Sequence, residues 1–219
     1  MSIISSLANN FTAAGKLKAA GFNNASLANV TALDSSIALG NLTLLSTQTA
    51  SASANISFTS GIDSTYDEYV FKFINIHPAT DAVNFQFNFS TDGGSNYNVT
   101  KTSTAFRATQ DEAGSFTLLG YDTNGDLAQS TSYQSLTSQL GNENDESVSG
   151  TLHLFEPSSA VFVKHFLANV NYSYKDPQSV NYYYAGYGNT TSAINAIDFK
   201  FSSGNIDDGI IKMYGVKKS

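Results

Sequence analysis

The sequence contains no cysteine and no tryptophan, and only 3 of its 219 residues are proline. A chain without cysteine forms no disulfide bond, presents no thiolate nucleophile and builds no cysteine-based zinc or iron–sulfur site. We therefore expect the stability of the folded protein to come from burial of a hydrophobic core, from contacts between subunits, or from both.

Charged residues are also scarce, at 13% of the chain. The 11 lysine and arginine residues are scattered, and the formal net charge is −7. Binding to a nucleic-acid backbone requires clustered positive charge, so we expect no nucleic-acid partner. Few segments combine Glu, Lys, Arg, Leu and Ala as surface helices do, so helix should be a minor part of the structure.

Long apolar segments are missing as well. No segment approaches the roughly 18 uninterrupted apolar residues of a transmembrane helix, and the first residues lack the basic and apolar regions of a signal peptide. The sequence therefore predicts a soluble chain that is made in the cytoplasm and has no membrane span.

Aromatic and small polar residues dominate what is present. The chain has 12 Tyr and 15 Phe among many Ser, Thr, Asn and Gly residues, a mixture that favours pleated strands joined by polar turns. From Leu42 onward, apolar residues recur with a period of two. The clearest case is Phe85, Phe87 and Phe89, which alternate with polar residues as in a strand with one buried face.

This periodicity predicts about ten to twelve short strands with few helical interruptions. The expected strands are residues 42–47, 55–59, 69–76, 85–89, 96–104, 115–119, 148–155, 161–172, 180–185, 197–201 and 209–215. The glycine turn at residues 92–95 predicts that 85–89 and 96–104 form a hairpin. We predict an all-β fold, specifically an antiparallel β-sandwich of jelly-roll type over residues 42–219, with an up-and-down barrel as second choice.

Residues 1–41 have a different pattern and are predicted to form a short, partly helical N-terminal arm. Apolar residues of the first turns fall at helical spacing, and a second apolar set is interrupted by Gly21. These apolar residues need a partner surface, either on their own domain or on a neighbouring subunit. The candidate partner-binding residues of the arm are Ile3, Ile4, Leu7, Phe11, Leu17 and Phe22.

No catalytic residues are predicted. The chain lacks the G-x-S-x-G elbow, and its three histidines show no close metal-ligand spacing, so we expect neither a metal nor a cofactor. Residues 122–126 resemble the start of a calcium loop, but Tyr133 stands where an EF-hand needs its bidentate glutamate. A pair of carboxylates on a sandwich could hydrolyse glycosides, although most Asp and Glu residues here lie in expected turns.

A tyrosine-rich segment is the one candidate contact site within the expected sandwich. Tyr182, Tyr183, Tyr184 and Tyr187 lie in or just after an expected strand. Tyrosine rings can stack on sugar rings, and tyrosine is also enriched where protein subunits pack together. Both roles remain open for these residues, and we favour the contact between subunits.

Several segments resemble structural proteins of marine tailed bacteriophages. The stretch GIDSTYDEYVF at residues 61–71 and the turn STDGGSNYN at residues 90–98 carry much of the resemblance. The remaining similar segments are residues 76–81, 189–197, 202–207 and 214–216. None of these segments contains a catalytic signature.

The resemblance implies a jelly-roll subunit of a virion, commonly a homotrimer, made in the cytoplasm of the host. Its expected partners are other copies of itself and either the major capsid protein or tail proteins of the same particle. We favour a non-enzymatic capsid decoration or cement protein, since an anchoring arm followed by one compact domain suits binding to a lattice. The alternative is a tail- or fibre-associated protein that binds carbohydrate on the host surface.

Overall fold

A computed structural model describes residues 41–216 of the chain. The predicted arm, including Ile3, Ile4, Leu7, Phe11, Leu17 and Phe22, therefore lies outside the described residues, as do residues 217–219. Within 41–216 the regular structure consists of twelve strands and contains no helix. Every strand pair is antiparallel, which confirms the all-β, antiparallel prediction for this part of the chain.

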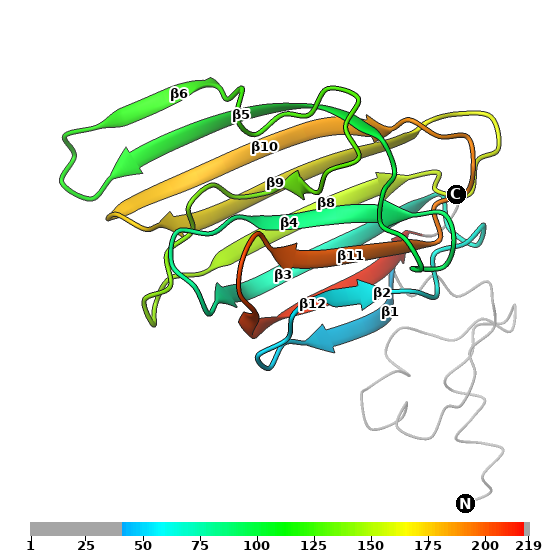
Figure 1. Ribbon diagram of the computed structural model, residues 1–219, viewed down its shortest axis with the longest axis horizontal. Helices are drawn as coiled ribbons and strands as arrows, with labels where there is room; N and C mark the ends of the chain where they lie inside the picture. The colour runs from blue at the N-terminus through cyan, green and yellow to red at the C-terminus, as the bar shows by residue number, and fades with distance from the viewer. Residues whose placement is uncertain (1–40, 217–219) are drawn as a thin grey trace, which may run out of the picture. The chain divides into compact units, whose positions relative to one another are not determined.

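Eight strands form a large sheet, whose order is β1-β12-β3-β8-β9-β10-β5-β6 (Figure 1). Its strands are β1 (Leu42–Thr49), β3 (Glu68–Pro78), β5 (Lys101–Asp111), β6 (Thr117–Tyr121), β8 (Val148–Phe155), β9 (Lys164–Tyr174), β10 (Gln178–Gly188) and β12 (Ile206–Val216). The strands β1 and β6 are the two edges, so this sheet does not close into a barrel.

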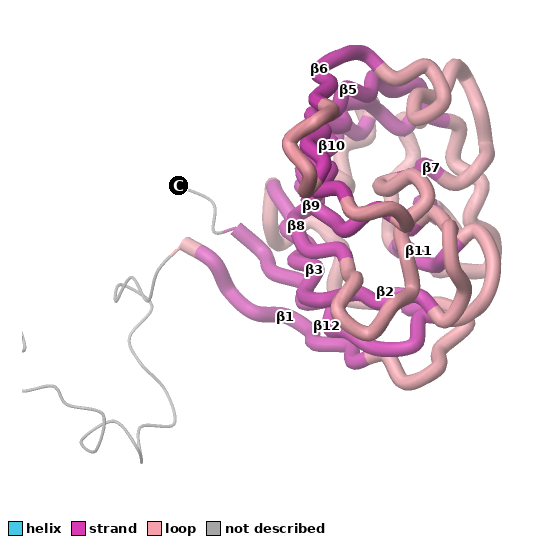
Figure 2. Tube along the Cα trace, turned by 90° about the vertical axis from the view of Figure 1, so that its left-hand side faces the viewer, coloured by secondary structure: helices cyan, strands magenta, loops and turns pink. Residues whose placement is uncertain are grey.

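Four strands form a small sheet of order β2-β11-β4-β7. Its strands are β2 (Ile56–Phe58), β4 (Phe85–Ser90), β7 (Gln134–Ser135) and β11 (Ala196–Phe201). The two sheets lie as two layers, and the loops of the small sheet lie on its side away from the large sheet (Figure 2). The described part of the chain is therefore a β-sandwich of unequal sheets.

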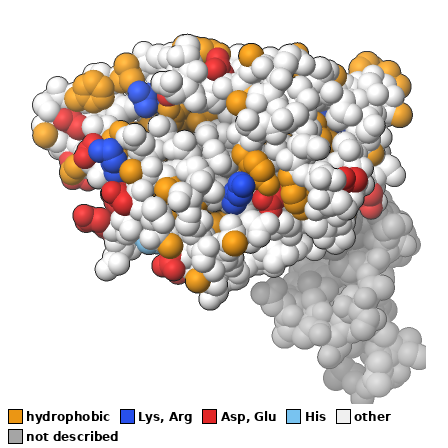
Figure 3. Space-filling view, viewed as in Figure 1, with side chains coloured by type: hydrophobic (Ala, Val, Ile, Leu, Met, Phe, Trp, Pro, Cys, Tyr) orange, Lys and Arg blue, Asp and Glu red, His pale blue; other side chains and the backbone are white. Residues whose placement is uncertain are grey.

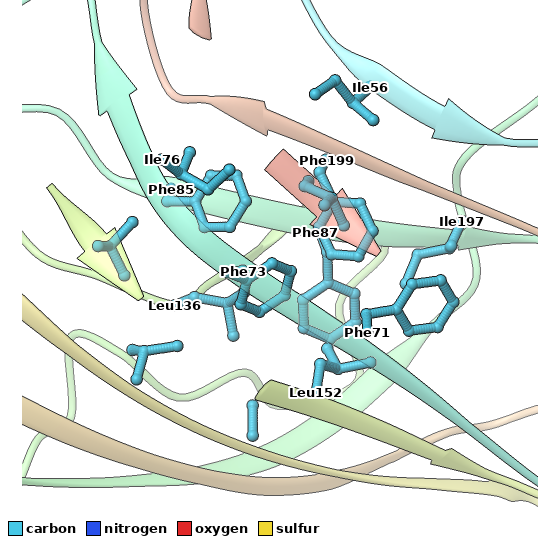
Figure 4. Close-up of a cluster of buried hydrophobic side chains, with 14 of the residues drawn as sticks. Ile56, Phe71, Phe73, Ile76, Phe85, Phe87, Leu136, Leu152, Ile197 and Phe199 are labelled. Carbon is cyan, nitrogen blue, oxygen red and sulfur yellow. The ribbon is translucent and has the colours of Figure 1, made fainter. Parts of the chain in front are cut away.

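The core lies between the two layers and is largely aromatic. Phe85, Phe87 and Phe89 of β4 are fully buried, as their alternation predicts. Figure 4 shows rings from β3 of the large sheet beside rings from β4 and β11 of the small sheet. Phe199 of β11 is at the centre of this cluster. Its ring centroid lies 5.2–6.4 Å from those of Phe58, Phe71, Phe73, Phe85 and Phe87.

One predicted pairing is wrong. The strand β4 does not form a hairpin with residues 96–104, since it pairs with β11 and β7 in the small sheet. The chain instead leaves the small sheet after Ser90, and at Lys101 it enters β5, which pairs with β10 and β6 of the large sheet. The glycine turn was correctly expected, but ten residues separate the two strands, enough for the chain to change sheets.

Candidate functional site

One face of the large sheet points away from the small sheet. Side chains alternate between the two faces of a strand, and residues opposite each other in neighbouring strands share a face. In β10, Tyr182 and Tyr184 are buried in the core while Tyr183 is exposed. Figure 2 shows no second layer of described residues on the side of the large sheet away from the small sheet. We assign the exposed Tyr183 to this side, because its neighbours Tyr182 and Tyr184 are buried between the sheets, and we call it the outer face.

Apolar side chains are prominent in two cross-strand rows of the outer face, which also carries polar side chains such as Asn169, Lys72 and Lys212. One row joins Tyr121, Phe106 and Tyr183 across β6, β5 and β10. A second row runs from β10 to β1 through Ala185, Leu167, His153, Val70, Tyr214 and Leu44. Tyr183 is 46% exposed, Leu167 50% and Leu44 52%, so water reaches large apolar groups at the β1 edge and in the interior of the sheet.

The edge strand β6 adds to this surface. It pairs only with β5, and its residues are exposed on both faces of the sheet apart from the half-covered Gly120. Leu119 is 78% exposed, and Leu118 and the preceding Phe116 are exposed as well. An exposed apolar edge strand presents unpaired backbone groups with which another chain can pair, so β6 is a candidate contact surface.

A shallow hollow lies near the centre of the outer face. The rings of Phe106 and Tyr183 stack with centroids 5.0 Å apart and an angle of 10° between their planes. They line a hollow of about 340 Å³ together with Thr151, His153, Leu167, Asn169 and Ala185. The hollow thus combines an aromatic wall with hydroxyl, imidazole and amide groups, and Nδ1 of His153 lies 2.5 Å from Oε1 of Glu68.

The buried side of β10 has a structural role. The ring of Tyr182 stacks between Tyr172 and Tyr184, at centroid distances of 6.2 and 5.1 Å. Tyr182 donates a hydrogen bond to the carboxylate of Asp122, and burial raises the pKa of Tyr182. Burial alone would raise the pKa of Asp122, but hydrogen bonds from Tyr182 and Asn124 outweigh it and lower that pKa.

The structure thus divides the four tyrosines of the predicted contact site. Tyr182 and Tyr184 lie in the core, which prevents them from contacting a ligand or another subunit directly. Tyr183 lies on the outer face, and the half-buried Tyr187 lies there beside His165, with ring centroids 6.1 Å apart. Sequence reasoning missed Phe106, Leu119 and Tyr121, which come from strands whose position in the sheet no local pattern predicts.

The acidic loop at residues 122–126 does not gather its carboxylates around one point. Asp122 is turned toward Tyr182, whereas Asp126 accepts a hydrogen bond of 2.5 Å from Tyr121. Within residues 41–216, no group of three or more His, Asp or Glu side chains is arranged to hold a metal ion.

Figure 3 shows that the face over the small sheet is mostly polar and uncharged, with small scattered groups of hydrophobic and charged side chains.

None of the described residues belongs to a helix that is long and apolar enough to cross a membrane. Comparison of the chain with protein-family models, with curated proteins and with solved structures finds no match.

Proposed function

We propose that the chain is a non-enzymatic structural protein of a tailed-bacteriophage virion, specifically a capsid decoration or cement protein anchored through its N-terminal arm. The proposal includes a jelly-roll connection of the strands, a partly helical arm and a homotrimeric assembly. Its support from the sequence is the resemblance of residues 61–71 and 90–98 to marine phage structural proteins.

The observation that carries the proposal is the two rows of apolar side chains on the outer face, together with the exposed edge strand β6. Soluble monomers rarely expose contiguous apolar surface of large extent, and such surface usually marks a contact with another molecule. The row through Tyr183 spans β6, β5 and β10, the row through Leu167 spans β10 to β1, and the exposed Leu119 of β6 adds to the first row. A surface of this kind suits a subunit that packs against copies of itself or against a capsid lattice.

Cryo-electron microscopy of intact particles tests this proposal directly. We expect density for the sandwich on the capsid lattice, with residues 1–40 against the coat protein. A Leu167→Asp variant should decorate particles poorly if the outer face is the contact, whereas Asn171→Asp, on the same strand and face, adds the same charge without removing an apolar group. Particles that carry neither variant nor wild-type protein on their capsid would refute the decoration role.

The hollow beside Tyr183 favours a second candidate, binding of host-surface carbohydrate by a tail- or fibre-associated protein. Aromatic rings stack on the C–H faces of pyranoses, and the Phe106–Tyr183 pair lies next to the polar side chains of Thr151, His153 and Asn169. Density at the tail tip in the same particles would support this role over decoration.

A glycan array followed by titration calorimetry tests the second candidate. Tyr183→Ala should abolish binding of any glycan that the wild-type protein retains, because it removes the stacking surface. Tyr187→Ala is the matched control, since Tyr187 lies on the same strand and face but does not line the hollow. Equal binding by both variants, or no glycan bound by the wild-type protein, would exclude the hollow as a sugar site.

A further inference from the structure

A buried lysine meets a buried asparagine where the two sheets join. Lys101 is the first residue of β5 in the large sheet and Asn88 belongs to β4 in the small sheet, and both side chains are fully buried. The Nζ atom of Lys101 donates a short hydrogen bond to Oδ1 of Asn88 and another, of 2.9 Å, to the carbonyl of Val99. None of the ion pairs between described residues includes Lys101.

The carboxamide of Asn88 is held in one position. Its Nδ2 donates to the carbonyls of Tyr97 and Thr131, at 2.7 and 2.9 Å, and its Oδ1 also accepts from the backbone N–H of Phe89 at 2.9 Å. Donors to Oδ1 draw electrons away from the amide carbon, which makes that carbon a better target for a nucleophile. The lysine amine is kept beside it by the surrounding backbone.

The lysine is suited to act as that nucleophile. Burial lowers the pKa of the Lys101 ammonium group to about 7, because no anion compensates for the loss of solvent. A substantial share of the amine is therefore neutral near neutral pH and carries a free electron pair. A neutral amine beside an immobilised carboxamide is the arrangement that an amide exchange reaction requires.

A buried acid lies on the adjoining strand. Asp198 of β11 is directly opposite Asn88 in the β4–β11 pairing, and residues so paired have Cβ atoms about 4.5–5.5 Å apart. Its carboxylate accepts hydrogen bonds from Ser57, Asn55 and Tyr133, at 2.5, 2.6 and 2.9 Å. The carboxylate thus lies on the strand next to that of the amide, which makes it the candidate proton carrier for the reaction.

We propose that Lys101 and Asn88 form an intramolecular isopeptide bond. The electron pair of Nζ attacks Cγ of Asn88, the Cγ–Nζ bond forms and the Cγ–Nδ2 bond breaks. The proton lost by Nζ passes to Nδ2 with Asp198 as carrier, and Nδ2 leaves as ammonia. The product is a secondary amide that joins β4 to β5 and closes residues 88–101 into a covalent ring, so no oxidant or further reactant is needed.

Mass spectrometry of the purified full-length protein after trypsin digestion tests this bond. Acylation of Lys101 blocks cleavage after it, so we expect one peptide of residues 73–107 that lacks the mass of one ammonia. Backbone fragment ions from within residues 88–101 should be absent, because the ring holds both pieces together. Cleavage after Lys101, with Asn88 unmodified, would overturn the proposal.

Four variants separate the bond from other reactions. Lys101→Arg keeps a basic side chain that does not form the bond, so the peptide containing Asn88 should not lose ammonia in this variant. If Asn88 instead formed a succinimide by itself, the loss of ammonia would persist in Lys101→Arg. Asn88→Asp should lose water instead and give a mature peptide of the same mass as the wild-type one. Asp198→Asn should slow bond formation in folded protein, with recovery in Asp198→Glu, and an unchanged rate in Asp198→Asn would remove Asp198 from the reaction.

Discussion

Replacing Phe199 by alanine is expected to destabilise the sandwich more than any change on its surface. Phe199 is fully buried, and its ring contacts five other phenylalanines. These neighbours come from both sheets, so the cavity left by the ring would lie between the two layers. Removal of a buried phenylalanine side chain costs about 3–5 kcal/mol of unfolding free energy.

We expect Phe199→Ala to fall near the upper end of this range. The aromatic pairs add about 0.5–1.5 kcal/mol each beyond the area that they bury, and the rings around Phe199 are held by strands that cannot all move inward. A loss of about 4 kcal/mol corresponds to a decrease in melting temperature of about 8–16 °C for a domain of this size.

Urea unfolding followed by circular dichroism measures this loss, and Phe106→Ala is its matched control. Phe106 is the same residue type on the outer face and is 46% exposed, so its replacement should cost about 1 kcal/mol or less. The two variants should therefore differ by about 3 kcal/mol in unfolding free energy. Equal midpoints for the two variants would show that the two sheets do not pack through Phe199.

Three further results are expected. Deletion of residues 1–40 should leave the β circular dichroism spectrum intact, because the described core lies within residues 41–216, and should abolish attachment to particles in a co-sedimentation assay. Leu119→Asp should shift the protein toward monomers in light scattering while the neighbouring Thr117→Asp does not, since only the first places a charge at a large exposed apolar group. The contribution of the buried tyrosines to stability in urea should not change with pH below about pH 10 and should fall above it, by about 1.4 kcal/mol per pH unit for each buried tyrosine such as Tyr182.

The sign of the last effect follows from the direction of the pKa shift. Burial raises the pKa of Tyr172, Tyr182 and Tyr184 above their ordinary value of 10.0, so the unfolded chain loses these protons first as the pH rises. Unfolding is then favoured above pH 10 and unaffected by these groups below it. A double variant, Tyr172→Phe with Tyr182→Phe, should flatten the alkaline decrease, and an unchanged decrease would contradict the assignment.

Much of the strand pattern could be predicted from the sequence because alternation is a local property. The residues 85–89 and 148–155 were expected as strands and are strands. The strand β7 was missed since its two residues, Gln134 and Ser135, are polar and too few to show a period. The prediction of a hairpin over residues 85–104 was wrong because a turn signal does not say which sheet the chain enters next.

For the candidate contact surface too, the sequence predicted part of the arrangement and the tertiary structure decided the rest. Alternation alone separates Tyr183 from Tyr182 and Tyr184, but it does not say which of the two sets is buried. The order of the strands decides that, since it places the small sheet over Tyr182 and Tyr184 and leaves Tyr183 beside Phe106. The outer face is therefore a property of the assembled sheet and not of any one strand.

The sequence by itself determined that the described part of the chain is an all-β, cysteine-free sandwich, because composition and a period of two are enough to select strands that bury one face. Only the tertiary structure placed Lys101 against Asn88, and only it made β6 an exposed edge. The physical reason is that strand partners are chosen by packing and connection over long distances in the chain, and local residue preferences carry little information about that choice.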